Sequence, residues 1–234
     1  MTRKSEEGFV CPVCGHPGKG VIYDSINITL DPQLKEGILD GTLFDLKCEN
    51  CGEVLDAPEE LIYHDMDQQT MFFLQPVGLR EKWPEITEQF QKLLATHMQI
   101  KDLFDADTEE YTYRVCFGRP ELLEKIFMLD AGLDDRQVEM IKLLFFLQNR
   151  EQFPGLIPEI LFAGFHEKDK WGLACYDRDS KEFIGTIELE RRVLDDEISA
   201  EADEILEILT PPYVNYMKYF DLFEEEDDPG DIHN

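Results

Sequence analysis

The chain has 234 residues, of which 43% are hydrophobic, so it can build one large domain or two small ones with a real core. Its 51 acidic residues against 22 basic ones give a net charge of −29, which disfavours binding to nucleic acids and to anionic membranes. No apolar run approaches the roughly 18 residues that a membrane span needs, and the N-terminus has no signal-peptide pattern, so we expect a cytoplasmic protein.

Four of the six cysteines form two matching units, Cys11-Pro12-Val13-Cys14-Gly15 and Cys48-Glu49-Asn50-Cys51-Gly52. Two residues between the thiols let one tight turn direct both sulfurs at one ion, and the following glycine can adopt the positive φ that closes the turn. In a chain without an export signal, this spacing predicts metal ligands rather than disulfides. The predicted ligands are Cys11, Cys14, Cys48 and Cys51.

Four thiolates in a tetrahedral arrangement suit Zn²⁺, and a closed site of this kind is structural because it leaves no position for water or substrate. Rubredoxin-like iron sites also use paired CxxCG turns, so Fe is the minor alternative as the cofactor. An iron centre would serve electron transfer and would colour the protein. The two remaining cysteines, Cys116 and Cys175, fall in predicted strands and are expected to be reduced core thiols.

The segment between the cysteine pairs, residues 15–47, is longer than a plain zinc ribbon needs. Residues 21–30 are rich in β-branched side chains and predict a strand. A short helix should follow, with Asp31 as its N-cap and Pro32 at its first position, ending at Gly41. Residues 43–47 then return as a strand into the second cysteine pair. The ribbon therefore carries an inserted strand, helix and strand.

Several of these segments together resemble the CpXC-domain family of bacterial and archaeal proteins. They are the first cysteine unit, the segment Asn27-Ile28-Thr29-Leu30-Asp31-Pro32-Gln33-Leu34-Lys35, the Cys48/Cys51 pair and the segment Leu61-Ile62-Tyr63-His64-Asp65-Met66-Asp67. The resemblance covers about the first half of the chain. It implies a metal-binding ribbon without an established activity, so it bears on the fold more than on the function.

Residues 61–65 and 70–74 flank a short turn and predict a β-hairpin that extends the sheet of the ribbon. His64 lies in the first of these strands. We expect it to be packed or hydrogen-bonded, with a pocket residue oriented by Asp65 or Asp67 as the alternative. A long helix should begin at Trp83 and run to about residue 105, and the polar residues 105–110 predict a linker.

The second half predicts a further α+β unit. A strand over 111–117 should precede two helices, one over 119–130 and one opened by Asp134 as its N-cap. Asp134 and Asp135 could form an acid–base or metal cluster, although capping and helix-dipole stabilisation explain them with fewer assumptions. The remaining predicted elements are an antiparallel meander (160–165, 171–176 and 183–189), an acidic helix (198–209) and an aromatic core or interface segment (213–220).

These elements predict an α+β fold with four parts. They are a CpXC-like zinc-ribbon domain with an inserted helix (1–80), a connecting helix and linker (81–110), an α+β domain with a helix pair and an antiparallel meander (111–222), and a disordered acidic tail (223–234). Residues 195–234 hold 14 acidic residues and the single base Lys218. This excess indicates either a solubilising tail, or a docking surface for a basic partner or a nucleic-acid mimic.

The sequence contains no GxSxG elbow, no P-loop, no dinucleotide-binding GxGxxG and no HExxH motif. We therefore predict a non-enzymatic zinc-binding module that acts through an unidentified protein partner, with neither nucleic acid nor membrane as a partner. One alternative is an enzyme with its site near the domain junction, using His64, Asp134 or Asp135. The other is an electron carrier with a four-thiolate iron centre.

Overall fold

The computed structural model describes residues 1–102, 111–167, 170–190 and 205–223. It has a mixed α+β fold, as predicted, and forms two compact units, residues 1–123 and 124–234. The boundary between the units falls within helix α3 (Arg119–Asp130), whereas the sequence analysis begins its second domain at residue 111. The predicted linker, most of the predicted acidic helix and the predicted acidic tail lie outside the described residues.

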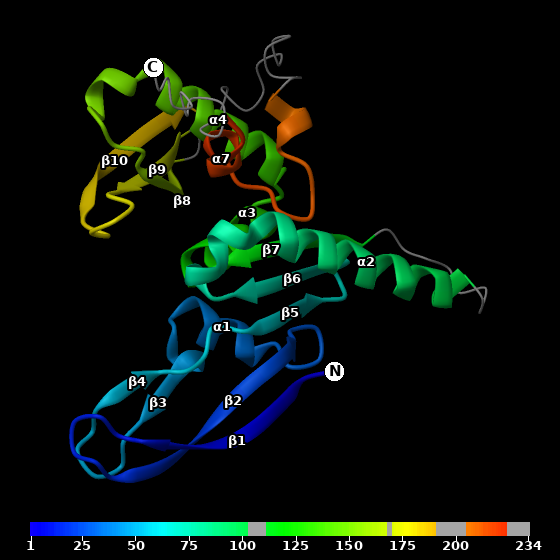
Figure 1. Cartoon of the computed structure of the whole chain (residues 1–234), viewed down its shortest axis with the longest axis vertical. Helices are drawn as coiled ribbons and strands as arrows, with labels where there is room; N and C mark the ends of the chain where they lie inside the picture. Colours follow the sequence, from blue (N-terminus) through cyan, green and yellow to red (C-terminus); the bar gives the residue numbers. More distant parts are fainter. Residues whose placement is uncertain (103–110, 168–169, 191–204, 224–234) are drawn as a thin grey trace, which may run out of the picture. The chain divides into compact units, whose positions relative to one another are not determined.

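The first unit contains a long hairpin, five further paired strands and one long helix. Its elements are β1 (Arg3–Val10), β2 (Pro17–Asn27), α1 (Gln33–Leu39), η1 (Thr42–Phe44), β3 (Asp45–Lys47), β4 (Val54–Asp56), β5 (Leu61–Asp65), β6 (Thr70–Gln75), η2 (Val77–Lys82), α2 (Trp83–Asp102), β7 (Thr112–Phe117) and the first turn of α3. Figure 1 shows β1 and β2 side by side in blue, with β3 and β4 as a second small ribbon.

The main sheet of the first unit has the strand order β1-β2-β5-β6-β7. The hairpins β1/β2 and β5/β6 are antiparallel, whereas β2/β5 and β6/β7 are parallel. Parallel neighbours need a crossover connection, and α2 belongs to the connection between β6 and β7. β7 is therefore a strand of this sheet, although the sequence analysis places residues 111–117 in the second domain.

Helix α2 covers one face of β6 and β7 (Figure 1). Phe90 of the helix packs edge-on against Phe73 of β6, with ring centroids 4.2 Å apart, and also contacts Tyr113 of β7. The strands β5 and β6 alternate between buried and half-buried side chains. This alternation is why the hairpin could be predicted, and the helical spacing of its apolar residues is why α2 could be.

Three local expectations in the first unit are wrong. Asp31 is not an N-cap, because Pro32 occupies that position and the Asp31 carboxylate instead accepts a hydrogen bond of 2.6 Å from the Thr2 hydroxyl. The predicted strand over 43–47 is the 3-10 turn η1 followed by the short strand β3. The predicted strand over 21–30 ends at Asn27 and begins earlier, at Pro17. Strands β1 and β4 were not predicted from the sequence.

The second unit contains the helix pair and the meander. Its further elements are α4 (Asp135–Gln148), η3 (Arg150–Gln152), β8 (Glu159–Glu167), β9 (Lys170–Tyr176), β10 (Phe183–Glu190) and α7 (Met217–Phe223). The three strands form an antiparallel sheet in the order β10-β9-β8, which confirms the predicted meander. Its core includes Trp171 of β9, Phe146 of α4 and Tyr216, all of them almost fully buried. The aromatic segment before and within α7 is therefore a core element.

None of the helices in the described part of the chain combines the length and the apolar character that crossing a bilayer requires.

Candidate metal centre

Two short turns with the same backbone pattern carry the four paired cysteines; we call residues 11–15 the first knuckle and residues 48–52 the second knuckle. In the first, the Gly15 amide donates to the Cys11 carbonyl at 2.8 Å, and in the second the Gly52 amide donates to the Cys48 carbonyl at 2.9 Å. Both glycines have positive φ, +68° and +80°. The knuckles are thus built alike, and glycine is needed at the turn because the left-handed region disfavours a Cβ.

The two knuckles bring all four sulfurs together. Their Sγ atoms lie within 4.8 Å of one another, and the group contains no histidine or carboxylate. Across the knuckles, the Sγ atoms of Cys11 and Cys51 are 3.6 Å apart, and those of Cys14 and Cys48 are 3.7 Å apart. A tetrahedral site with Zn–S bonds of about 2.3 Å would place its sulfurs about 3.8 Å apart. The donor set and its spacing therefore fit one tetrahedral metal ion.

The cluster is half buried. Cys11 and Cys48, the first cysteine of each knuckle, are buried, whereas Cys14 and Cys51 are exposed. All six cysteines lie in the described residues and all are free of disulfides. The Asn50 side chain, followed by a backbone contact at His16, lowers the pKa of Cys14 from 9.0 to about 6. Against a backbone contact at Glu53, burial and the neighbouring thiols raise the pKa of Cys51 from 9.0 to about 12. Thiolate is the form that binds metal, so the contacts of Cys14 favour its ligating state.

His64 lies outside the cysteine cluster and is held by two neutral partners. Its Nδ1 is 3.3 Å from the Asn27 amide nitrogen, and its Nε2 is 3.3 Å from the Tyr111 hydroxyl. Partial burial is the largest cause of a lowered pKa for this histidine. These contacts match the expectation of a hydrogen-bonded histidine, and Tyr111 is a partner that sequence reasoning missed because it is distant in the chain.

The two segments that carry the family resemblance outside the cysteines bind each other. The amide of Ile28 donates to the His64 carbonyl at 2.9 Å, and the Thr29 hydroxyl accepts from the Met66 amide at 2.9 Å. Asn27, which is 1% exposed, also accepts from the Leu30 amide through its side chain. The polar residues of these segments therefore hold the end of β2 against β5.

Asp134 and Asp135, the other candidates for a catalytic site, hold structural partners in the second unit. Asp134 is the N-cap of α4, as predicted, and accepts a hydrogen bond of 2.9 Å from the Arg136 amide. The Asp135 carboxylate lies 3.0 Å from the Lys125 ammonium. Capping and ion pairing thus account for both residues.

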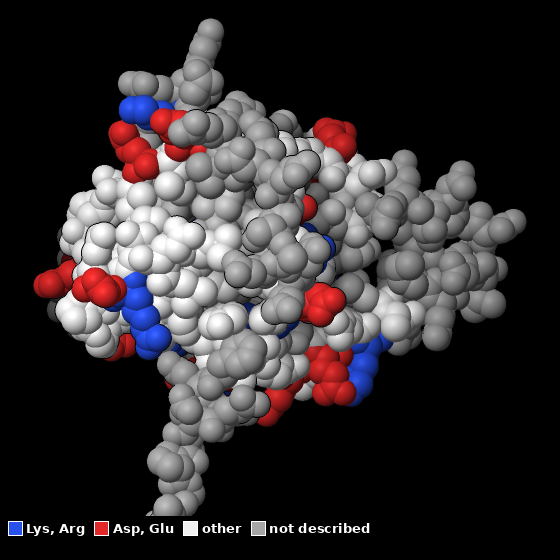
Figure 2. All heavy atoms as spheres, turned by 90° about the horizontal axis from the view of Figure 1, so that it is seen from above, with Lys and Arg blue, Asp and Glu red and all other residues white. Residues whose placement is uncertain are grey.

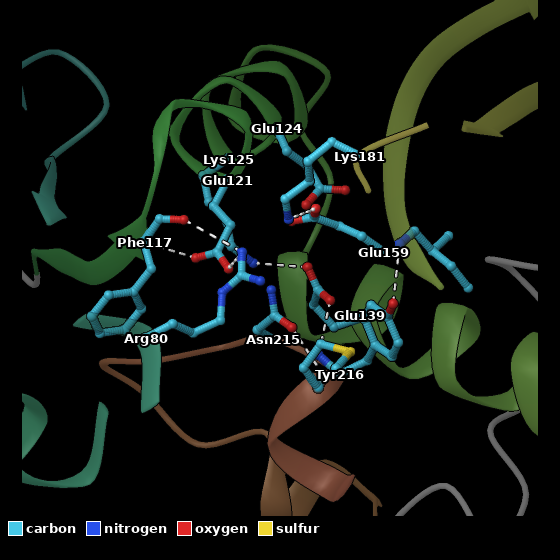
Figure 3. Close-up of polar contacts among 12 residues, drawn as sticks. Arg80, Phe117, Glu121, Glu124, Lys125, Glu139, Glu159, Lys181, Asn215 and Tyr216 are labelled. Atoms are coloured by element: carbon cyan, nitrogen blue, oxygen red, sulfur yellow. Dashed lines mark hydrogen bonds and ion pairs between the residues drawn. The ribbon is translucent and has the colours of Figure 1, made fainter. Parts of the chain in front are cut away.

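The second unit contains a cluster of four buried charged residues and the half-buried Asp135, which was not predicted from the sequence. We call it the buried charge cluster, and its members are Glu124, Lys125, Asp135, Glu139 and Lys142. The Glu139 carboxylate contacts the Lys142 ammonium at 2.9 Å. It also contacts the Lys125 ammonium at 3.2 Å and accepts from the Tyr216 amide at 3.0 Å (Figure 3). The available signal was charged residues inside two helices whose other positions are mostly apolar.

The buried charge cluster holds three acids and two lysines, so its carboxyl groups outnumber its cations. Glu124 is the member with an unsatisfied atom: one of its oxygens contacts Lys142 and the Phe162 amide, but its Oε2 has no hydrogen-bond partner among the described residues. Burial raises the pKa of Glu124 from 4.5 to about 7, against the attraction of Lys142 and with the repulsion of Glu139. Holding a proton on Glu124 would balance the cluster.

We expect Glu124→Gln to change how stability depends on pH. Between pH 4.5 and pH 7 the folded chain keeps a proton on Glu124 that the unfolded chain has lost, so rising pH weakens folding there. From pH 4.5 to pH 7, the free energy of unfolding of the wild type should fall by up to about 3 kcal/mol more than that of the variant. Urea unfolding of both proteins at several pH values measures the difference. Two curves that run parallel from pH 4.5 to pH 7 would contradict this assignment.

Comparison with known proteins identifies a family. A family model described as CpXC protein matches residues 9–142, which is more than half of the chain. The match spans both knuckles, the His64 segment and all the strands of the main sheet from β2 onward. No curated protein matches the chain, and no solved structure does.

Proposed function

The chain belongs to the CpXC protein family, and from this premise we propose that it is a zinc-binding protein whose four-cysteine site is structural and which acts through contacts with other proteins. The observation that carries the proposal is the sulfur cluster: four thiols from two like-built knuckles, spaced as tetrahedral zinc requires. With four protein ligands, zinc would have no open position for a substrate. The metal would therefore hold the two knuckles together.

Metal analysis of the untagged protein, purified from its own host, tests the identity of the ion. We expect one zinc per chain and no visible absorbance. Iron with visible absorbance would instead support the electron-transfer alternative, because four thiolates also bind iron. A protein that carries no metal under reducing conditions, and takes up none, would contradict both readings.

Removal of the metal should also destabilise the first unit. A strong chelator is expected to lower the melting temperature and to increase the hydrogen exchange of the knuckles, since the binding energy of a structural metal is part of the folding energy. Added Zn²⁺ should restore both measurements. An unchanged melting curve after complete metal loss, verified by elemental analysis, would show that the site does not support the fold.

A role in protein contacts is supported by the closed donor set and by the structural partners of His64, Asp134 and Asp135. Figure 2 shows one face of the molecule, on which the acidic side chains lie in several separate groups and some have basic side chains beside them. The net charge of −29 makes a basic protein the favoured partner. Salt-sensitive recovery of a basic protein from native lysate would support this part, and recovery of none would count against it.

The cytoplasm is the proposed compartment. A reducing environment keeps thiols at metal-ligand spacing free to bind an ion rather than to pair as disulfides. Fractionation of the host cell with an antibody against the chain tests this location.

A further inference from the structure

Strand β1 forms one edge of the main sheet of the first unit and is solvated on both faces. It pairs with β2 on one side, regularly from Lys4 to Val10 and with an irregularity between Arg3 and Lys4, and no strand in the described part of the chain pairs with its other side. Six of its eight residues are exposed and the remaining two are half buried. An edge strand presents a row of backbone N–H and C=O groups that can pair with another strand. β1 is thus a candidate site for strand addition.

The charges along β1 follow an order that fits a second copy of the same strand. Arg3 and Lys4 precede Ser5, and Glu6 and Glu7 follow it. In an antiparallel pair with Ser5 opposite Ser5, Lys4 lies opposite Glu6 of the second copy and Arg3 lies opposite Glu7. By symmetry each of these contacts occurs twice. Opposite charges directly across an antiparallel pair are stabilising, whereas like charges are destabilising.

The neighbouring registers lack this match. A two-fold axis perpendicular to the sheet keeps each side chain on its own face, so only residues of the same face can lie opposite each other. The two-fold axis therefore passes through a residue, and each neighbouring register moves it by one residue, which shifts one strand against the other by two. Centring the pair on Lys4 places the two lysines opposite each other, and centring it on Glu6 does the same with the two glutamates. Only the register centred on Ser5 pairs all four charged residues with opposite charges.

The strand is also held in place at both ends, so it loses little conformational entropy when it pairs with a second strand. Near its start, the Thr2 hydroxyl donates to Asp31 at 2.6 Å and accepts from the Asn27 amide at 3.0 Å. At its other end it leads directly into the first knuckle, where the Cys11 amide donates to the His16 carbonyl at 3.0 Å.

The contacts that the charged residues already make leave them accessible. Glu6 lies 2.7 Å from Lys19, but both side chains are more than half exposed, at 61% and 71%. Lys4 lies over the ring of Tyr23 at 5.9 Å on the exposed surface. Both residues can therefore take part in a further contact at the strand edge.

We propose that β1 is a self-association site, where two copies of the chain pair their β1 strands antiparallel with Ser5 on the two-fold axis and join their main sheets into one. An edge with a single sign of charge would repel a second copy, whereas this edge attracts one. The repulsion between two chains of charge −29 opposes pairing, but it is screened beyond about 8 Å at physiological salt. This inference goes beyond the proposed function and does not depend on which metal is bound.

The test is sedimentation velocity of the full-length, metal-loaded protein at physiological salt, from micromolar concentration to about 0.5 mM, because one strand pair buries less area than a standard interface and should bind weakly. The variants are Lys4→Glu, Glu6→Lys and the double exchange K4E/E6K. Lys92→Glu and Glu88→Lys are matched controls, since they reverse an exposed ion pair on α2 with the same changes in net charge.

We expect the wild type to dimerise reversibly and each single variant to bind itself at least about tenfold more weakly, because each substitution makes two attractive contacts repulsive. The double exchange should dimerise again. An equimolar mixture of the two single variants should form a heterodimer, because positions 4 and 6 are both acidic in one variant and both basic in the other. The control variants should behave as the wild type does.

Two outcomes would overturn the proposal. One is a wild type that stays monomeric over the whole concentration range. The other is a dimer that neither single variant weakens, or that the controls weaken equally, since it would then use another surface. Metal content and melting temperature, measured on the same samples, separate these outcomes from any failure of the zinc site.

Discussion

Cys14→Ser is expected to remove the metal and to destabilise the first unit by at least about 3 kcal/mol, which corresponds to a fall of about 10 °C in its Tm. Cys14 is exposed, so the substitution loses little packing, and the effect should come almost entirely from the metal. A serine hydroxyl is not deprotonated at neutral pH and cannot replace a thiolate ligand. Metal content and a thermal melt of the purified variant measure the two effects.

Val13→Ser is the matched control for this experiment. Val13 lies in the same knuckle and is 66% exposed, but it offers no ligand. It should keep one metal per chain and melt close to the wild type. If Cys14→Ser kept both its metal and its melting temperature, the four-cysteine site would not be structural.

Lys142→Met should be the most damaging substitution in the second unit. The Lys142 side chain is completely buried, contacts both Glu124 and Glu139, and lies over the Tyr216 ring. Methionine fills a similar volume but leaves two buried carboxyl groups with one lysine fewer. Breaking a buried pair in this way typically costs about 3–5 kcal/mol. Urea unfolding with a probe in the second unit, such as the fluorescence of Trp171, measures the loss.

Lys92→Met supplies the comparison. Lys92 forms an ion pair of 2.6 Å with Glu88, but both side chains are about two-thirds exposed. Such surface pairs contribute about 0–1 kcal/mol. Equal losses in the two variants would show that the buried charge cluster is no more important than a surface pair.

The parts of the fold that could be predicted are those with a regular apolar pattern. Residues 61–65 alternate cleanly, and α2 repeats its apolar residues at helical spacing, so both elements were found close to their real bounds. The cysteine cluster was found because its spacing alone defines a turn. The buried charge cluster was not predicted. The periodicity of a helix indicates which of its faces is buried, but it does not indicate which charged residues of two helices lie opposite each other.

β1 could not be predicted for a different reason. Arg3 to Glu7 are almost all charged, and a strand that is exposed on both faces has no apolar alternation to reveal it. It is a strand because it pairs with β2 as a hairpin across the first knuckle. The role of Asp31 could not be predicted either, because it depends on a residue that is distant in the sequence. Its position before Pro32 suits a cap, but its carboxylate accepts a hydrogen bond from the Thr2 hydroxyl.

The strand order of the first sheet also sets the timing of its assembly during synthesis. β1 and β2 are consecutive and can pair as soon as both have left the ribosome, whereas β2 must wait for β5, and β6 for β7. The thiols of the first knuckle likewise wait for Cys48 and Cys51. During this interval the nascent hairpin carries two thiols without their partners and an open edge, so a reducing environment that keeps both thiols free favours its assembly.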